Sequence, residues 1–473
     1  MTTIRLPRFL EKLYSCSKMV KDKMKIGEIP STREIYSRTL NMALPATTET
    51  VLVGMMGIID TIMVGTIGAA AIAAVGITNQ PRFIVLSIVI ALNMGVTAIV
   101  ARRKGGGEIT QAQSSLKQAI LLSLFISLLL SSAAYLAAYP LLSLAGAGSD
   151  IIDDSVMFFR ITVLSIPLAS LGMTINAAQR GAGNTRISMR TNIAANVIKI
   201  IFNFLLIGGH LGFPQLGIRG AAIATMIGFI VAFLMSVHSV SGKKSELNIL
   251  SLKGWKFDKQ TLTGFANVGS GALVEQLFMR FGFLMFIRVV AGLGTMALAI
   301  HQICMNIVML SFGFAEGLGI AASALVGQSL GAKRSDMAII YGKVCQRIGF
   351  TLSAVMSVVF IFGRRGLIRM FTSEEEIIQT GSYLILILAV ITFAQISQFI
   401  ISGALRGAGD AKYVAFVAFV TIGVLRPGLA WLFAFPLGMG LVGIWFSFLV
   451  DQAVRLALYY GRFTATKWVH IRL

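Results

Sequence analysis

The sequence predicts an all-α integral membrane protein with twelve transmembrane helices in two parallel six-helix lobes. Of its 473 residues, 56% are hydrophobic and only 13% are charged, and the mean hydropathy is +0.81. In a soluble domain about 25% of the residues are charged. Apolar blocks of about 20 residues, the length that crosses a bilayer, recur along the chain. Short motifs also return at one fixed offset, which indicates an internal repeat.

Twelve apolar blocks are separated by short loops that carry charge or glycine. An even number of spans places both termini on the same side of the membrane. The predicted spans are 40–64, 77–100, 118–138, 156–177, 187–208, 219–239, 263–290, 297–325, 341–362, 381–403, 413–434 and 439–460.

Lysine and arginine are distributed unequally between the two sides of the predicted membrane. The segments on the side of the termini hold 30 of these residues, and the opposite loops hold four. Basic residues accumulate in cytoplasmic loops, so both termini are expected in the cytoplasm. The acidic segments 149–154 and 372–376 fall on the outer side.

A repeated motif reveals the duplication. AQRGAGNTR (178–186) returns as ALRGAGDAK (404–412), 226 positions later. Because six helices are an even number, the halves run in the same direction, and a pseudo-two-fold axis along the membrane normal, with a cleft between the lobes, is expected. The same offset relates Gly68 to Gly294, Gly105 to Gly331, and Glu49 to Glu275.

The repeat sets the expected domain boundaries. A cytoplasmic basic arm, partly helical along the membrane surface, comes first, and a cytoplasmic linker separates the lobes. The ranges are 1–38 for the arm, 39–240 for the N-lobe, 241–262 for the linker, 263–462 for the C-lobe and 463–473 for the cytoplasmic tail.

Several function classes are not expected. The net charge of +21 is spread between apolar blocks rather than gathered on one face, which argues against nucleic-acid binding. The three cysteines form no CxxC pair and the four histidines are isolated, so neither a metal site nor a cofactor is expected. P-loop, HExxH and GxSxG motifs in their structural settings are lacking, so the chain is not expected to be an enzyme.

Ionisable residues at hydrocarbon depth are candidates for function because they are expensive to keep in lipid. Glu49 and Asp60 in the first span are eleven residues apart. This spacing places them within about 20° on one helix face and roughly 16 Å apart along it. Pro45 removes a backbone hydrogen bond from the same helix and is expected to act as a hinge. Glu275, the repeat partner of Glu49, is a carboxylate within the seventh span.

The fifth span carries a polar stripe, and its members are Asn192, Asn196, Lys199 and Asn203. Steps of four, three and four residues place them on one face of an otherwise apolar helix. This face must contact protein or water rather than lipid. Either ion binding or hydrogen bonding between helices is consistent with the pattern.

Other charged residues of the spans have a structural interpretation. Arg82, Arg160 and Arg288 lie near predicted helix ends, from which a long side chain reaches the membrane interface. Asp451 and Arg455 are spaced i,i+4 and are expected to pair, with Arg426 as a third member. The RGAG segments are expected to form glycine turns, with their arginines at the headgroups.

The stretches MGIIDTIMVGTIGAAAIAAVG, GALVEQLFMRFG, RVVAGLGTMALAIHQI and GIWFSFLVDQAVR, together with both RGAG segments, follow one another in a distinctive order. From about residue 35 on, this order resembles the MATE (multidrug and toxic compound extrusion) transporters of the MOP flippase superfamily. The resemblance implies a secondary antiporter that exports organic, cationic or amphipathic compounds. Export would be driven by inward flow of H⁺ or Na⁺ as the two lobes rock about the cleft.

The resemblance also implies roles for individual residues. Asp60 matches a cation-coupling acid in the outer half of the family's first helix, Pro45 matches a point of bending, and Glu275 matches a coupling carboxylate of the second lobe. Many members carry Asn-x-x-x-Asp in the fifth helix, where this chain has Lys199-x-x-x-Asn203. This departure argues against a standard Na⁺ site beside Asp60, and no other metal site is expected.

Asp60 and Lys199 lie within one or two helical turns of each other in predicted depth. An unpaired charge in this setting is strongly destabilising, so an ion pair is expected. Asn196 and Asn203 complete the predicted coupling cluster. We interpret this cluster as a proton-exchange site, and a static ion pair with coupling left to Glu275 is the alternative.

The sequence thus predicts a multi-pass transporter of the cell (plasma or inner) membrane. It is expected to act on a small organic substrate as a monomer in the lipid bilayer, with H⁺ or Na⁺ as the coupling ion. Glu49 and Asn192 are secondary site candidates. A lipid-linked precursor flippase of the same superfamily, and a membrane-embedded enzyme or channel, stay open as other classes.

The topology gives a first testable prediction. Single cysteines introduced at Asp150 and Glu375 should react with a membrane-impermeant thiol reagent added outside intact cells, because both positions lie in predicted outer loops. Labelling of these positions only from the cytoplasmic side would contradict the topology.

Overall fold

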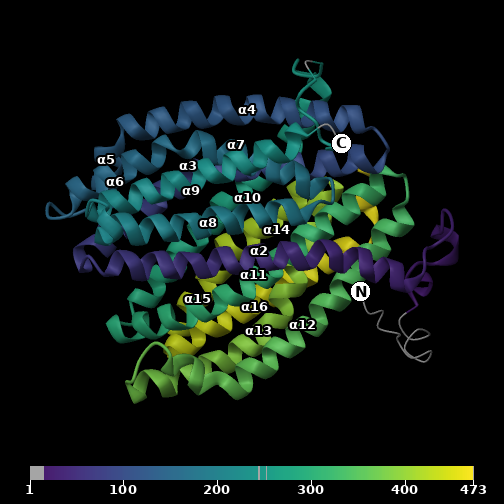
Figure 1. Ribbon diagram of the computed structural model, residues 1–473. Helices are drawn as coiled ribbons and strands as arrows, with labels where there is room; N and C mark the ends of the chain where they lie inside the picture. Colours follow the sequence, from purple (N-terminus) through teal and green to yellow (C-terminus); the bar gives the residue numbers. More distant parts are fainter. Residues whose placement is uncertain (1–14, 243–244, 252, 472–473) are drawn as a thin grey trace. The chain divides into compact units, whose positions relative to one another are not determined.

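The computed structural model describes residues 15–242, 245–251 and 253–471, and within these ranges it contains helices and loops but no strand (Figure 1). All twelve predicted spans fall on helical segments, which confirms the predicted fold class. The first repeat holds α2 (Thr32–Gly65), α3 (Ala69–Gly105), α4 (Ile109–Leu136), α5 (Ala138–Leu144), α6 (Ile152–Leu164), α7 (Ile166–Gly181), α8 (Thr185–Gly208) and α9 (Gly217–Ser241).

The second repeat follows in the same order. Its helices are α10 (Lys259–Ala291), α11 (Thr295–Gly331), α12 (Ser335–Arg369), α13 (Glu375–Ala408), α14 (Ala411–Ala418), the π-helical segment η4 (Phe419–Leu425), α15 (Arg426–Ala434) and α16 (Gly440–Thr464). Short 3₁₀ helices are η1 (Cys16–Met19), η2 (Asp22–Met24), η3 (His210–Gly212) and η5 (Lys467–His470).

Ten helices in the described part of the chain are long and apolar enough to cross a membrane. The pair α6 and α7, bent by 45°, supplies an eleventh span. Pro167 stands at the start of α7 and has no N–H to continue the helix, which explains the bend. The remaining predicted span coincides with α10, which falls outside this criterion of length and composition.

The backbone confirms the internal repeat. Left-handed residues that end or precede helices recur at the offset of 226. The pairs are Gly68 and Gly294 (φ 138° and 98°), Gly107 and Lys333 (77° and 57°), and Gly183 and Gly409 (88° and 94°).

Several helices begin earlier than predicted. α3 starts at Ala69 rather than residue 77, because the alanine-rich stretch after Gly68 has high helix propensity. Arg82 therefore lies within α3 and not near its end, so the expectation that it reaches the membrane interface from a helix end was wrong.

The chain divides into two compact units. One comprises the described residues of Met1–Thr47, Ala101–Gly107 and Leu277–Leu473, and the other comprises those of Thr48–Val100 and Glu108–Gln276. The helices α2, α3 and α10 are each divided between the units. This division differs from the predicted lobes, whose boundaries stay a prediction.

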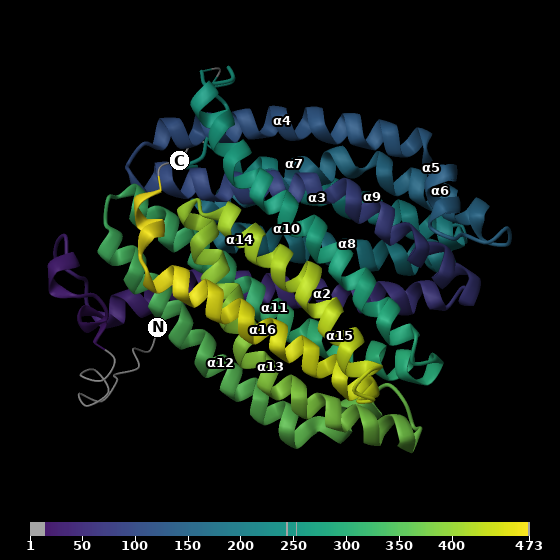
Figure 2. The same cartoon turned by 180° about the vertical axis from the view of Figure 1, so that it is seen from behind.

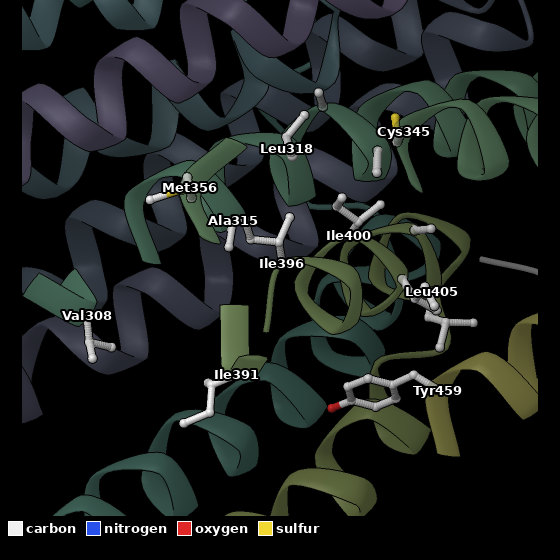
Figure 3. Close-up of a cluster of buried hydrophobic side chains, with 14 of the residues drawn as sticks. Val308, Ala315, Leu318, Cys345, Met356, Ile391, Ile396, Ile400, Leu405 and Tyr459 are labelled. Atoms are coloured by element: carbon white, nitrogen blue, oxygen red, sulfur yellow. The ribbon is translucent and has the colours of Figure 1, made fainter. Parts of the chain in front are cut away.

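In the unit that contains α11 to α16, α13 packs against α11, α12 and α16 (Figure 2). Figure 3 shows apolar side chains of these helices, among them Leu318 and Ile396, gathered in one buried cluster. Gly403 and Gly407 of α13 lie against the backbone of Gly319 and Ser323 in α11. Small residues four positions apart allow such close approach of membrane helices.

The segment before α2 is anchored to the same unit. Cys16 is fully buried, Lys343 Nζ in α12 donates to the Met19 carbonyl at 2.6 Å, and Asp336 Oδ2 accepts the Ile26 N–H at 3.2 Å. Within residues 15–31, therefore, the N-terminal arm packs against α12, where the sequence suggested a helix along the membrane surface.

The other unit holds the polar cluster predicted in the first repeat. There α8 packs against α9, and α7 packs against α4, α8 and α9 (Figure 1). The linker after α9 is held to α4 by Lys117, whose Nζ donates to the carbonyls of Ser251 and Lys253, each at 2.7 Å.

The close approach of α11 and α13 predicts the effect of a single methyl group. A Cβ at position 407 would lie 2.1 Å from the Ser323 carbonyl oxygen, so Gly407→Ala should destabilise the protein by about 1–3 kcal/mol through overpacking. Thermal unfolding of the purified protein in detergent measures this loss. Gly461→Ala, at an exposed site of α16 with open space for a Cβ, is the matched control. Equal unfolding temperatures for the two variants would contradict the packing.

Candidate functional site

A cavity of about 460 Å³ lies inside the unit formed by Thr48–Val100 and Glu108–Gln276. Its walls come from α2, α3, α6, α8 and α9 and combine apolar side chains such as Phe83 and Phe158 with a polar group. The polar lining residues are Asp60, Thr61, Asn79, Arg82, Lys199, Asn203 and Thr225.

The predicted ion pair between α2 and α8 is present in this cavity. Lys199 Nζ donates to Asp60 Oδ2, and Asn203 Nδ2 donates to Asp60 Oδ1 at 3.0 Å. The side chains of Lys199 and Asp60 are 20% and 22% exposed, which leaves the pair in contact with the cavity. The geometry of this pair is confirmed, and its role in coupling stays a prediction.

The opposite helix makes room for the lysine. Gly228 of α9 faces α8, and a Cβ there would lie 3.1 Å from Lys199 Cβ and 3.3 Å from the Ala195 carbonyl oxygen. A larger residue at this position would press on the stem of Lys199. The absence of a side chain at Gly228 thus helps to place the ammonium beside Asp60.

Arg82 adds a second cation to the cavity. Its Nη2 donates to Asn79 Oδ1 at 3.1 Å, one turn earlier on α3. The cavity wall therefore carries two basic side chains and one acidic side chain. The sequence interpretation placed Arg82 near a helix end and not in a site, because it began α3 too late.

A second polar cluster surrounds Glu49, the other acid of α2. Glu49 Oε1 accepts from Asn192 Nδ2 at 2.6 Å, from Ser188 Oγ at 2.8 Å and from Arg180 Nη1 at 3.3 Å. Arg180 belongs to the first RGAG segment, at the end of α7. The expectation that this arginine faces the lipid headgroups was wrong, because the ion pair with Glu49 draws it into the protein.

Three other predicted site residues are Asn196, Glu275 and Pro45. Asn196 Nδ2 donates to the Asn192 carbonyl at 2.8 Å, within α8. Glu275 is buried in α10 and is not a lining residue of the cavity. Pro45 lies within α2, which continues through it as one helix.

The other unit contains a buried ion triad, as the sequence suggested. Asp451 Oδ2 accepts from Arg426 Nε at 3.0 Å, and both carboxylate oxygens of Asp451 accept from Arg455 Nη2 at 2.8 Å. Arg455 Nε also donates to Thr421 Oγ1 in η4 at 3.2 Å. Pro427 follows η4 at the start of α15 and cannot supply an N–H to the preceding turn, which favours the wider π-helical path.

The clusters around Asp60, Glu49 and Asp451 do not have the composition of a protein metal centre. In residues 15–242, 245–251 and 253–471, no three His, Cys, Asp or Glu side chains gather as a metal-binding group. Among the residues that the structure describes, the cavity lining contains one carboxylate, Asp60, and an ammonium group, Lys199, is its ionic partner.

Comparison with known proteins decides the family. The MatE family profile matches residues 45–205 and 272–432, one match in each repeat. The chain belongs to the MATE family. Its two matches start 227 residues apart, which agrees with the repeat seen in the sequence and the backbone.

Two relatives align over nearly the whole chain. The "Uncharacterized transporter YisQ" of Bacillus subtilis is 29% identical, over 91% of this chain and 94% of its own length. The "Probable multidrug resistance protein NorM" of Thermotoga maritima is 28% identical, over 95% and 96%.

Solved structures share the fold. A MOP superfamily transporter from Pyrococcus furiosus matches with a TM-score of 0.85 and 18% sequence identity, covering 92% of this chain and 97% of its own. The family match and the names of the two relatives identify the chain as a membrane transporter of the MATE family and not an enzyme.

The buried triad predicts a strong effect on stability. Asp451→Asn would leave Arg426 and Arg455 buried without their anion, and loss of one partner from such a group costs about 3–5 kcal/mol. Yield and thermal unfolding in detergent should both fall. Asp153→Asn on α6, where the carboxylate is exposed, serves as the control and should behave as the wild type. An unchanged unfolding temperature for Asp451→Asn would contradict a structural role of the triad.

Proposed function

We propose that this MATE-family transporter is a multidrug efflux antiporter that exports organic, cationic or amphipathic compounds by alternating access. It would lie in the cell membrane as a monomer with both termini in the cytoplasm. The family membership and the name of the Thermotoga maritima relative, a probable multidrug resistance protein, support export of small molecules. The charge asymmetry of the loops supports the orientation.

The coupling ion in the first repeat is H⁺, exchanged at Asp60. The observation that carries this proposal is the ion pair of Asp60 with Lys199 in the cavity wall, completed by Asn203. A proton on Asp60 would remove the charge that holds the ammonium. Lys199 would then be released from its ion pair. The change in charge would alter the electrostatic interaction between the cavity wall and a substrate bound there.

Sodium is a weaker candidate at the same position. A Na⁺ ion on Asp60 would have to displace the ammonium from Oδ2 while Lys199 keeps its charge nearby. Arg82 adds a further positive charge to the wall of the cavity. A proton is held by one bond to a carboxylate oxygen, whereas a hard metal cation needs several oxygen ligands. Asp60 is the one carboxylate among the described lining residues, so this lobe favours the proton over a metal cation.

The next step of the proposed transport cycle is a change in the shape of α2. Pro45 weakens the hydrogen bonding of the helix, and the boundary between the two contact units falls just after it, between Thr47 and Thr48. We propose that α2 bends here when the charge on Asp60 changes. Glu275 stays proposed as the coupling carboxylate of the second repeat.

A pair of variants tests the coupling. Asp60→Asn cannot bind a proton and should abolish dye efflux from everted vesicles driven by a pH gradient, with efflux normalised to the amount of protein in the vesicles. Lys199→Ala removes the competing ammonium and should gain efflux driven by a Na⁺ gradient. Asp153→Asn is the control for the carboxylate.

The outcomes separate the alternatives. Full pH-driven efflux in Asp60→Asn would show that coupling does not depend on this carboxylate. In that case Glu275→Gln becomes the decisive variant, because it is the alternative carrier of the coupling. Lys199→Ala without Na⁺-driven efflux would show that the lysine is not a substitute for a dissolved cation.

A further inference from the structure

The contact between α2 and α8 contains the same acid–amide pair twice. Asn192 Nδ2 donates to Glu49 Oε1, and Asn203 Nδ2 donates to Asp60 Oδ1. The partners are separated by 143 positions in both pairs, so the two helices run in the same direction and keep register. Eleven residues correspond to about three helical turns, roughly 16 Å. The Glu49 cluster therefore repeats the Asp60 cluster at a second depth.

Each acid also has one basic partner. Asp60 pairs with Lys199 of α8, and Glu49 pairs with Arg180 of α7. The neutral groups on Glu49 come from α8, namely Ser188 and Asn192. The difference lies in exposure, because the Glu49 side chain is only 7% exposed, against 22% for Asp60.

The two oxygens of Glu49 are treated unequally. Oε1 accepts all three donors, whereas Oε2 is buried and has no hydrogen-bond partner among the described residues. A bare carboxylate oxygen in a buried site is costly. A proton on Oε2 removes the negative charge from this buried carboxyl group and leaves Oε1 as the acceptor for all three donors. The geometry thus suits a carboxyl group that binds and releases a proton at Oε2.

We propose that Glu49 is a second proton-exchange site of the first repeat, in series with Asp60, with Arg180 of the RGAG segment as its counter-ion when it is ionised. This rests on the proposed function, in which H⁺ is the coupling ion. The proton leaves the carboxyl group of Asp60, Lys199 pairs with the resulting carboxylate, and Glu49 Oε2 takes up the proton. Arg180 then loses its anion until Glu49 releases the proton on the predicted cytoplasmic side.

The face of α8 between the two acids is suited to this transfer. Asn192, Asn196 and Lys199 follow one another along it, and Asn196 Nδ2 donates to the Asn192 carbonyl at 2.8 Å. This face therefore places side-chain amide groups between Asp60 and Glu49. The RGAG arginine thereby acquires a positioning role in the proton path.

Infrared difference spectroscopy tests the titration directly on the full-length purified protein in liposomes. The wild type should show carboxyl C=O bands that appear as the pH is lowered. Glu49→Gln should lose one band and keep the band that Asp60→Asn loses. If Glu49→Gln keeps every band, Glu49 does not bind a proton and this inference fails, while the proposed role of Asp60 is untouched.

The pH profile of efflux tests Arg180. Loss of a neighbouring cation lets a carboxyl group hold its proton to higher pH. Arg180→Gln should therefore move the midpoint of pH-driven efflux upward by about one pH unit, a tenfold change in proton concentration. Arg180→Lys should restore the midpoint, and Arg190→Gln, at an exposed site of α8, should leave it unchanged.

The outcomes are distinguishable. Lower activity of Arg180→Gln at every pH with the same midpoint would mean that Arg180 only supports the structure, which overturns its role as counter-ion. If Asp60→Asn retains pH-driven efflux, the proposed function fails. If Asp60→Asn loses pH-driven efflux and Glu49→Gln transports with the wild-type midpoint and rate, only the second site is refuted.

Discussion

The hydrocarbon interior of a bilayer supplies no water to a polar group, and this constraint governs the whole molecule. Backbone groups are satisfied within helices, and buried charges must find partners inside the protein. Asp60 with Lys199, Glu49 with Arg180, and Asp451 with Arg426 and Arg455 all meet this requirement. The pairs that join two helices, Asp60 with Lys199, Glu49 with Arg180 and Asp451 with Arg426, also restrict how these helices are turned about their axes. Charges that look like defects in an apolar sequence therefore organise its packing.

The register of α2 and α8 connects fold and function in the first repeat. Two acid–amide pairs at the same separation hold the helices over three turns, yet their surroundings differ. Asp60 lies on a cavity and pairs with a flexible lysine, whereas Glu49 is enclosed and pairs with an arginine. The contact between α2 and α8 thus contains one acid–amide pair that faces a cavity and one that is buried in the protein.

Much of this arrangement could be predicted, and the parts that could not share a physical cause. Hydropathy and the offset of 226 gave the helices and the repeat, because both are local or periodic properties. The pair of Asp60 and Lys199 followed from their depths below the predicted helix ends. Arg82 was misplaced because an alanine-rich helix start looked like a loop.

The ion pair of Glu49 with Arg180 could not be derived, since 131 residues separate the two and packing alone brings them together. The sequence did hold one signal, because a glutamate and an RGAG arginine recur together at positions 275 and 406. The anchored N-terminal segment was missed for the same reason. Its polar composition conceals three buried apolar side chains, at Cys16, Met19 and Val20, which belong to the apolar cluster of the unit that contains α12.

The lysine beside Asp60 differs from a dissolved ion in one respect. It is covalently tethered, so its local concentration at the carboxylate is set by four methylene groups and the position of α8, and salt outside the membrane does not change it. A dissolved cation would have to compete with the Lys199 ammonium for the Asp60 carboxylate, and dilution does not remove this ammonium. In the proposed mechanism, a carboxylate paired in this way responds to the acidity of the medium and not to its content of other cations.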